Sequence, residues 1–234
     1  MTTIEELDQR FYPGYVDEHR RFDALIRSYL RPEIAALDAG AGRGLMYPYD
    51  YREIVGRMAG ADEDPAVMNN TNLSEAAVAD LAHLPYEDGE FDLVFSKYVF
   101  EHLERPLAVM RELRRVMKAD GHLLIHTPNR WHYVAMVATV TPTSFHAWFN
   151  AKRGRVDADT FPTRYRANDR RTLQRLAEAS GFRIDRFDIL ETKPDYLAFH
   201  PMAYQAGILY ERIVNRWPRL TPFRVQIIAD MQAV

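Results

Sequence analysis

The chain has 234 residues, of which 47% are apolar and 27% are charged, proportions of a folded globular protein rather than a disordered one. It contains no cysteine, which excludes disulfides, thiolate metal sites and a cysteine nucleophile. The net charge of −3 gives no reason to expect nucleic acid as a partner. We find no basic and apolar leader and no apolar run near the roughly 20 residues of a transmembrane helix. We therefore expect a cytoplasmic protein without a transmembrane segment.

Charge is distributed unevenly along the chain. Residues 50–112 carry 14 acidic against 5 basic side chains, and residues 152–186 carry 10 basic against 5 acidic ones. Two solvated faces would explain this pattern. The alternative is a region that holds a cationic ligand, followed by one that meets an anionic substrate or surface.

The periodicity of apolar residues predicts the elements in chain order. Residues 4–30 read as helical, with an interruption at Pro13-Gly14. Strands are expected at residues 34–38, 57–61, 76–79, 91–95, 122–126 and 182–190, with Tyr196–Phe199 as a candidate for another. Helices are expected within 45–60 and over 106–118, 170–180 and 202–217.

This alternation of strands and helices predicts an α/β fold with a mostly parallel sheet covered by helices on both faces. Ligands of such sheets bind beyond the carboxyl ends of the strands, near the point where the strand order reverses. Functional residues should therefore follow the predicted strand ends, at Leu37, Ala61, Ala79, Phe95 and Ile125.

A glycine-rich motif follows the first predicted strand, in Leu37-Asp-Ala-Gly-Ala-Gly-Arg-Gly44. Three glycines at alternate positions let the backbone approach a ligand closely before the next helix. The spacing is GxGxG, whereas the pyrophosphate-binding fingerprint is GxGxxG.

Carboxylates follow the next strands at matching places. Asp62 ends the second predicted strand, where a carboxylate can accept hydrogen bonds from both hydroxyls of a ribose. Asp80 follows the third, where it can accept a bond from an amino group. Each could be a surface residue by itself, but their recurrence at successive strand ends indicates a nucleoside site.

Further motifs are Ala79-Asp-Leu-Ala-His-Leu-Pro85, Phe91-Asp-Leu-Val-Phe-Ser96, Phe100-Glu-His-Leu103, Glu112–Gly121 and Thr127-Pro-Asn129. With the glycine motif and Gly60-Ala-Asp62, they resemble the class I S-adenosylmethionine-dependent methyltransferases, in particular the type 11 branch, over roughly residues 33–190. The resemblance implies a Rossmann-like, mostly parallel seven-stranded sheet and S-adenosyl-L-methionine as cofactor, with S-adenosyl-L-homocysteine as product.

The resemblance also assigns roles to the residues at the strand ends. It implies that Gly40, Ala41 and Gly42 line the methionine moiety of the cofactor in a pocket organised by Asp38. It places the ribose at Asp62 and the adenine beside Glu63, Asp80 and Leu81. Ser96 and Lys97, after the fourth strand, would border the transferable methyl group.

Two histidines are candidate bases. His102 follows the fourth strand and is a packing or capping residue, a base, or part of a metal pair with Glu101. A metal site needs at least three ligands, which cannot be assembled here, so none is expected. His132 follows the fifth strand and is a second candidate to reach substrate.

Residues 131–169 form a long connection rich in aromatic residues and arginine. They are either a packing elaboration or a lid that binds an acceptor with an anionic group, through Arg130, Arg153, Arg155, Arg164 and Arg166. The apolar stretch Tyr204–Ile228 is a core helix, a homodimer face or a helix that touches lipid.

We interpret the chain as a single methyltransferase domain, with a helical cap (1–30), a cofactor-binding core (31–130), a substrate lid (131–169) and a carboxyl-terminal part (170–234). The expected reaction is in-line methyl transfer to a hydroxyl oxygen of a small molecule or of a carbohydrate or lipid precursor, since a histidine base suits a hydroxyl. The acceptor would be anionic or glycolipid-like. The alternatives are a non-catalytic cofactor-binding scaffold and a nicotinamide-dependent oxidoreductase.

Overall fold

The computed structural model describes residues 3–44, 50–140 and 162–234. Their contacts divide the chain into two compact units. Unit 1 comprises Met1–Arg20, Pro128–Pro162 and Ile189–Gln226, and unit 2 comprises Arg21–Thr127, Thr163–Asp188 and Ile227–Val234. Nearly all of the sheet belongs to unit 2.

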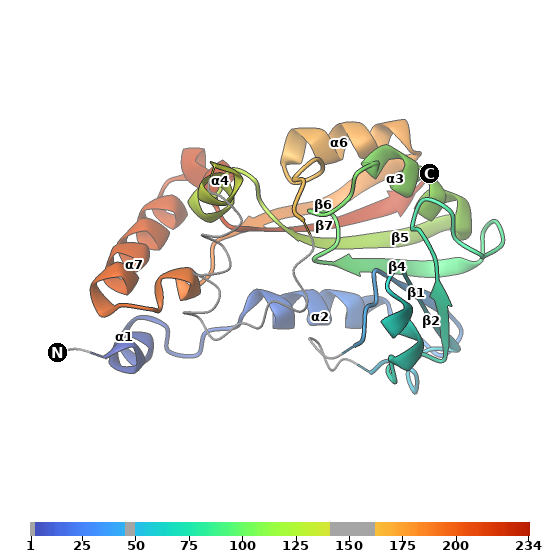
Figure 1. Ribbon diagram of the computed structural model, residues 1–234, viewed down its shortest axis with the longest axis horizontal. Helices are drawn as coiled ribbons and strands as arrows, with labels where there is room; N and C mark the ends of the chain where they lie inside the picture. Colours follow the sequence, from blue (N-terminus) through green and yellow to red (C-terminus); the bar gives the residue numbers. More distant parts are fainter. Residues whose placement is uncertain (1–2, 45–49, 141–161) are drawn as a thin grey trace. The chain divides into compact units, whose positions relative to one another are not determined.

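The sheet has seven strands in the order β3-β2-β1-β4-β5-β7-β6. β1 pairs in parallel with β2 and β4, β2 with β3, and β4 with β5. Figure 1 shows β7 running in the opposite direction to β4. The strand bounds are Ala35–Ala39 (β1), Arg57–Asp62 (β2), Glu75–Val78 (β3), Phe91–Lys97 (β4), Met117–Pro128 (β5), Phe182–Leu190 (β6) and Gln226–Ala233 (β7).

The order of the strands reverses between β1 and β4. Leu93, Val94 and Phe95 of β4 are buried, which explains why this strand reads as a nearly continuous apolar run. The carboxyl ends of β1 and β4 therefore lie side by side, and the segments that follow them diverge there. This is the position at which ligands bind in open parallel sheets.

Three helices pack on the sheet of unit 2: α2 (Glu18–Tyr29), α3 (Pro106–Val116) and α6 (Arg170–Ala179). Figure 1 shows α3 and α6 together on one face and α2 on the other. Pro106 opens α3, where a missing N–H costs nothing, and the Asp169 carboxylate accepts from the N–H of Thr172 to cap α6. The short 3-10 helix η1 (Pro65–Asn69) follows β2.

Unit 1 is mainly helical. It contains α1 (Ile4–Phe11), α4 (Tyr133–Val140), α7 (Pro201–Arg216) and the 3-10 helices η3 (Asp195–Leu197) and η4 (Pro218–Phe223). A capping box between Thr3 and Glu6 begins α1, and Leu7 of α1 packs against Tyr204 and Ile208 of α7. No helix in the described part of the chain is both long and apolar enough to cross a membrane.

The sheet, its parallel core and the helices on both faces confirm the predicted fold class. The candidate strand Tyr196–Phe199 is wrong, because Asp195–Leu197 form a 3-10 turn. The last strand is instead Gln226–Ala233. It begins inside the apolar stretch Tyr204–Ile228, for which a helix was expected. Residues 50–56 form turns rather than the helix expected within 45–60, and residues 45–49 lie outside the described part of the chain.

Candidate active site

The glycine loop after β1 is held in a conformation that side chains would disturb. Gly40 has a φ of 90°, and a Cβ atom there would lie 2.2 Å from Cγ2 of Val99. Gly42 has a φ of 48°, in the left-handed region that glycine adopts without strain. Glycine at position 40 therefore lets Val99 pack directly against the loop, and glycine at position 42 allows the positive φ.

The side chain of Asn70 supports this loop through hydrogen bonds. The sequence did not predict this role. Its side chain is buried, and its Nδ2 donates to the carbonyls of Ala41 (3.1 Å) and Gly42 (3.3 Å). A Cβ atom on Gly44 would lie 2.2 Å from Oδ1 of Asn70. Asn70 therefore fixes the loop through two of its carbonyls.

Asp62 ends β2 beside the glycine loop. Its Oδ2 accepts from the N–H of Gly42 at 2.9 Å, and its Oδ1 accepts from the N–H of Asp64 at 2.8 Å. The side chain is half-buried. Each carboxylate oxygen can accept two hydrogen bonds, so the two backbone bonds orient Asp62 and leave acceptor capacity on both oxygens.

Asp38 lies in β1, one residue before its end. Burial, reinforced by the negative charge of Asp62, raises the pKa of Asp38 to about 7, although Lys97 opposes the shift. The side chain is nevertheless partly accessible to solvent. A carboxyl group in this setting loses its proton readily when a cation binds beside it.

The remaining predicted cofactor residues differ in their surroundings. Asp80 is exposed, and its carboxylate accepts from the N–H of Ala82 (2.8 Å) and from Arg105 (2.9 Å). These bonds, led by the one from Ala82, lower the pKa of Asp80. Leu81 is buried beside it, and Glu63 is exposed.

Ser96 and Lys97 end β4, next to β1. Ser96 is fully buried, and its hydroxyl donates to the carbonyl of Ala39 at 2.7 Å. This bond ties β4 to the start of the glycine loop. Lys97 is half-buried, and Tyr98 after it has a φ of 57°, which turns the chain sharply at the end of the strand.

His102 and Glu101 form a pair on the segment after β4. Nε2 of His102 lies 3.9 Å from Oε1 of Glu101, and the two side chains are 29% and 6% exposed. Oε2 of Glu101 accepts from the hydroxyl of Thr127, at the carboxyl end of β5, at 2.8 Å. Burial raises the pKa of Glu101 to about 7.

The Glu101 pair is held from a third segment as well. Asn168 is fully buried, and its Nδ2 donates to Oγ1 of Thr127 at 2.7 Å. The carbonyl of Glu101 accepts from the N–H groups of Arg164 (2.6 Å) and Tyr165 (3.0 Å). Hydrogen bonds therefore connect residues 101, 127 and 164–168 at the carboxyl edge of the sheet. The sequence did not predict that these three segments lie together.

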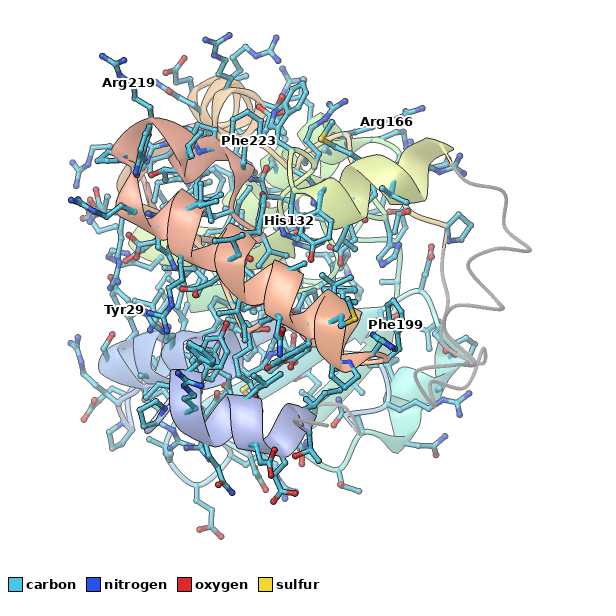
Figure 2. The ribbon with its side chains drawn as sticks, turned by 90° about the vertical axis from the view of Figure 1, so that its left-hand side faces the viewer. Tyr29, His132, Arg166, Phe199, Arg219 and Phe223 are labelled. Atoms are coloured by element: carbon cyan, nitrogen blue, oxygen red, sulfur yellow. The ribbon has the colours of Figure 1, made fainter. Side chains whose placement is uncertain are left out.

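His132 lies in unit 1 and forms a second pair with Glu191. Its Nε2 is 3.5 Å from Oε1 of Glu191, and the side chains are only 3% and 5% exposed. Figure 2 shows His132 between α4 and α7. The rings of Tyr133 and Tyr210 pack against it at 4.1 and 5.6 Å, which encloses the imidazole.

The predicted lid is described only at its two ends. Arg164 pairs with Glu104, Arg166 donates to the Glu104 carbonyl, and Arg130 stacks on Trp131. Arg153 and Arg155 lie outside the described residues. Among residues 3–44, 50–140 and 162–234, no group of three or more histidine or acidic side chains could hold a metal ion.

These residues fit the cofactor implied by the family resemblance. At Gly42 the nearest atom to the position that a Cβ would take, Oδ2 of Asp62, is 4.0 Å away, and Asp62 retains acceptor capacity on both oxygens for a pair of hydroxyls. The nearby carboxyl of Asp38 suits a positively charged sulfonium. All of them belong to unit 2.

Comparisons with known proteins agree with the family resemblance. Residues 37–125 match the family model described as "Methyltransferase domain". A protein of Mycolicibacterium smegmatis named "Probable S-adenosylmethionine-dependent methyltransferase" is 29% identical over 97% of this chain and 83% of its own length. A Mycobacterium tuberculosis protein of the same description is 35% identical over 55% of this chain, which spans 47% of that relative.

Among solved structures, the geranyl diphosphate C-methyltransferase of Streptomyces coelicolor matches with a TM-score of 0.58. The match covers 93% of this chain and 79% of that one at 14% identity. That structure contains Mg²⁺, geranyl diphosphate and S-adenosyl-L-homocysteine. At this identity the likeness shows a common fold.

Proposed function

Because the chain belongs to the class I S-adenosylmethionine-dependent methyltransferases, we propose that it methylates a hydroxyl oxygen of a small molecule or of a carbohydrate or lipid precursor. The protein is a methyltransferase, and S-adenosyl-L-methionine is its cofactor. The nicotinamide-dependent and non-catalytic alternatives are therefore set aside. The proposal concerns the acceptor atom and the residues that act on it.

The cofactor-binding residues proposed here are those of the glycine loop and the neighbouring strand ends. Gly40, Ala41 and Gly42 would lie along the methionine part, with Asp38 near the positive charge, and Asp62 would hold the ribose hydroxyls. Glu63, Asp80 and Leu81 would surround the adenine, and Ser96 and Lys97 would border the methyl group. When bound, S-adenosyl-L-methionine supplies an electrophilic methyl group on a sulfonium.

The observation that carries the proposal is the partly open imidazole of His102 beside the buried carboxyl of Glu101. A hydroxyl acceptor loses a proton on methylation, and His102 is placed after β4, where it can accept that proton. Glu101 would act through His102 as a positioning residue, because a negative carboxylate 3.9 Å from Nε2 stabilises the protonated ring. Thr127, which itself accepts a hydrogen bond from Asn168, donates to that carboxyl and holds it in place.

Binding and orientation would supply most of the remaining rate enhancement. Methyl transfer requires the acceptor oxygen to lie in line with the bond that breaks, and correct placement is worth up to roughly 7–11 kcal/mol. The hydrogen-bonded residues Glu101, Thr127 and Asn168 would form a fixed surface against which the acceptor is oriented. We also propose an anionic or glycolipid-like acceptor, which the arginines of residues 130–166 would suit.

The test is to identify the methylated atom directly. The protein would be incubated with ¹³C-methyl S-adenosyl-L-methionine and a panel of hydroxylated acceptors, and the product examined by mass spectrometry and NMR. We expect a new methyl group attached to oxygen. A methyl group on nitrogen or carbon would overturn the choice of acceptor atom. The absence of any product across the hydroxylated acceptors would overturn the proposed acceptor class.

His132 is a second candidate base, favoured by its short distance to Glu191. Its ring is enclosed by tyrosines, and the loss of solvent around Tyr210, together with the charge of Glu191, raises the pKa of Tyr210 to about 12. Enclosure of this kind suits a packing role better than proton exchange with an acceptor. We therefore propose His102 rather than His132 as the base.

A further inference from the structure

One face of α7 exposes large apolar side chains in a regular row. Met202, Leu209 and Ile213 are 73%, 62% and 45% exposed, and Trp217, directly after the helix, is 63% exposed. Their spacing of seven, four and four residues places them along one side of the helix. Phe223 of η4, 42% exposed, extends the row, and we call these five residues the α7 face.

The α7 face is not the side by which the helix packs into unit 1. Tyr204 and Ile208 are buried against Leu7 of α1. Helical geometry places these two residues on the side of α7 roughly opposite to Leu209 and Ile213. The helix is therefore apolar on two sides, and only one of them packs against other residues that the structure describes in its unit. A row of exposed large apolar residues marks an interaction site rather than a packing surface.

The charges around the α7 face are all positive. Arg216 and Arg219 are exposed along the same stretch. The only acidic residue between 196 and 225 is Glu211, which is 9% exposed. It accepts from Asn215 within the helix and pairs at 3.3 Å with Arg212, which also donates to the carbonyl of Phe11 in α1. A chain with a net charge of −3 thus presents here a surface that is locally apolar and cationic.

Aromatic side chains lie near both ends of the helix. Figure 2 shows Phe199 near the beginning of α7 and Phe223 beyond its end, next to Arg219. Trp217 follows the last turn. Aromatic rings and arginines that flank an apolar row are typical of helices that lie in the plane of a membrane interface.

We propose that the α7 face binds an anionic lipid surface, with α7 lying parallel to the membrane. The arginines would meet lipid phosphates while Leu209, Ile213 and Trp217 enter the boundary of the acyl chains. A second copy of the chain is a poorer partner, because two-fold pairing of this face would bring arginines together with no exposed acid on the stretch to meet them. The proposal does not depend on the acceptor atom or on the catalytic base.

The first experiment measures co-sedimentation of the full chain with vesicles. One set contains phosphatidylcholine and phosphatidylglycerol in equal parts, and the other contains phosphatidylcholine alone. We expect binding to the anionic vesicles that weakens as salt is added, and much weaker binding to the neutral ones. Absence of binding to the anionic vesicles at low salt would overturn the proposal.

Two double variants separate the apolar and the electrostatic contributions. Leu209→Gln with Ile213→Gln should weaken binding to anionic vesicles about tenfold or more. Arg216→Gln with Arg219→Gln should weaken it about fivefold per arginine, without changing binding to neutral vesicles. Both pairs are exposed, and calorimetric binding of S-adenosyl-L-homocysteine would verify that each variant is folded.

Matched controls carry the same substitutions elsewhere on the surface. Met68→Gln with Val78→Gln removes two exposed apolar residues of unit 2, and Arg31→Gln with Arg111→Gln removes two exposed arginines. Both should bind vesicles like the unaltered protein. Equal losses in controls and test variants would reveal a non-specific charge effect and would overturn the proposal. So would a dimer, seen by sedimentation velocity, that Leu209→Gln with Ile213→Gln dissociates while vesicle binding is unchanged.

Discussion

Two histidine–glutamate pairs of similar composition have different surroundings. His102 and Glu101 lie 3.9 Å apart at the sheet edge of unit 2, with 29% of the imidazole exposed. His132 and Glu191 lie 3.5 Å apart within unit 1, with 3% of the imidazole exposed. The shorter distance belongs to the pair that cannot readily exchange a proton with a substrate. Access, rather than pair geometry, therefore distinguishes a candidate base from a packing residue.

The same contrast extends to the other carboxyl groups. Asp38 and Asp62 are half-buried at the strand ends, where a ligand can still reach them. Glu191 is buried, and its charge contributes to the raised pKa of Tyr210. Substitutions in unit 2 should therefore change binding or turnover, and those around His132 should change stability.

The largest effect is expected at the open pair. His102→Ala should lower kcat by about 10²–10⁴, because no base then takes up the proton that the substrate hydroxyl loses on methylation. Affinity for S-adenosyl-L-homocysteine, measured by calorimetry, should stay unchanged. A near-normal kcat would remove His102 from the mechanism. Glu101→Gln should cause a smaller loss together with a shift of the pH–rate profile, a change that a merely structural role would not produce.

The enclosed pair should respond through stability. His132→Ala should lower the free energy of unfolding by about 3 kcal/mol, because it leaves Glu191 buried without its partner. The double variant His132→Leu with Glu191→Leu should recover part of this loss, since both polar groups are then removed. Urea unfolding measures both. A stable His132→Ala protein with a strongly reduced kcat would reverse the assignment of the two histidines.

Cofactor affinity should depend on Asp62. Asp62→Ala should weaken binding of S-adenosyl-L-homocysteine by about 2–3 kcal/mol, because two hydroxyls lose their acceptors and the loop loses the bond from the N–H of Gly42. Asp88→Ala, at an exposed carboxylate, serves as the control. An unchanged dissociation constant by calorimetry would contradict the proposed ribose site.

The smallest expected effect is the pH dependence of binding through Asp38. Its pKa of about 7 should fall when a cation binds beside it, so binding of S-adenosyl-L-methionine releases a proton. Affinity should then rise about tenfold between pH 6 and pH 8 and level off above that range. Asp38→Asn should abolish this slope. A slope that survives the substitution would assign the titration to another group, such as Glu101.

The sequence by itself determined the local parts of this protein. The alternation of elements, the glycine motif and the acids at strand ends depend on short-range patterns, and they led to the correct fold class and cofactor. Each of these features is decided within a few residues of the chain.

Only the tertiary structure decided the features that join distant segments. Gln226–Ala233 is buried on both sides as a strand of the sheet, although it includes Gln226, Asp230 and Gln232. Its sequence shows neither a strict alternation nor a continuous apolar run, so periodicity does not predict a strand there. The hydrogen bonds of Thr127 to Glu101 and from Asn168 join three segments, and the support of the glycine loop by Asn70 spans 28 positions. The exposure that separates His102 from His132 likewise depends on what packs around each ring, which local sequence does not record.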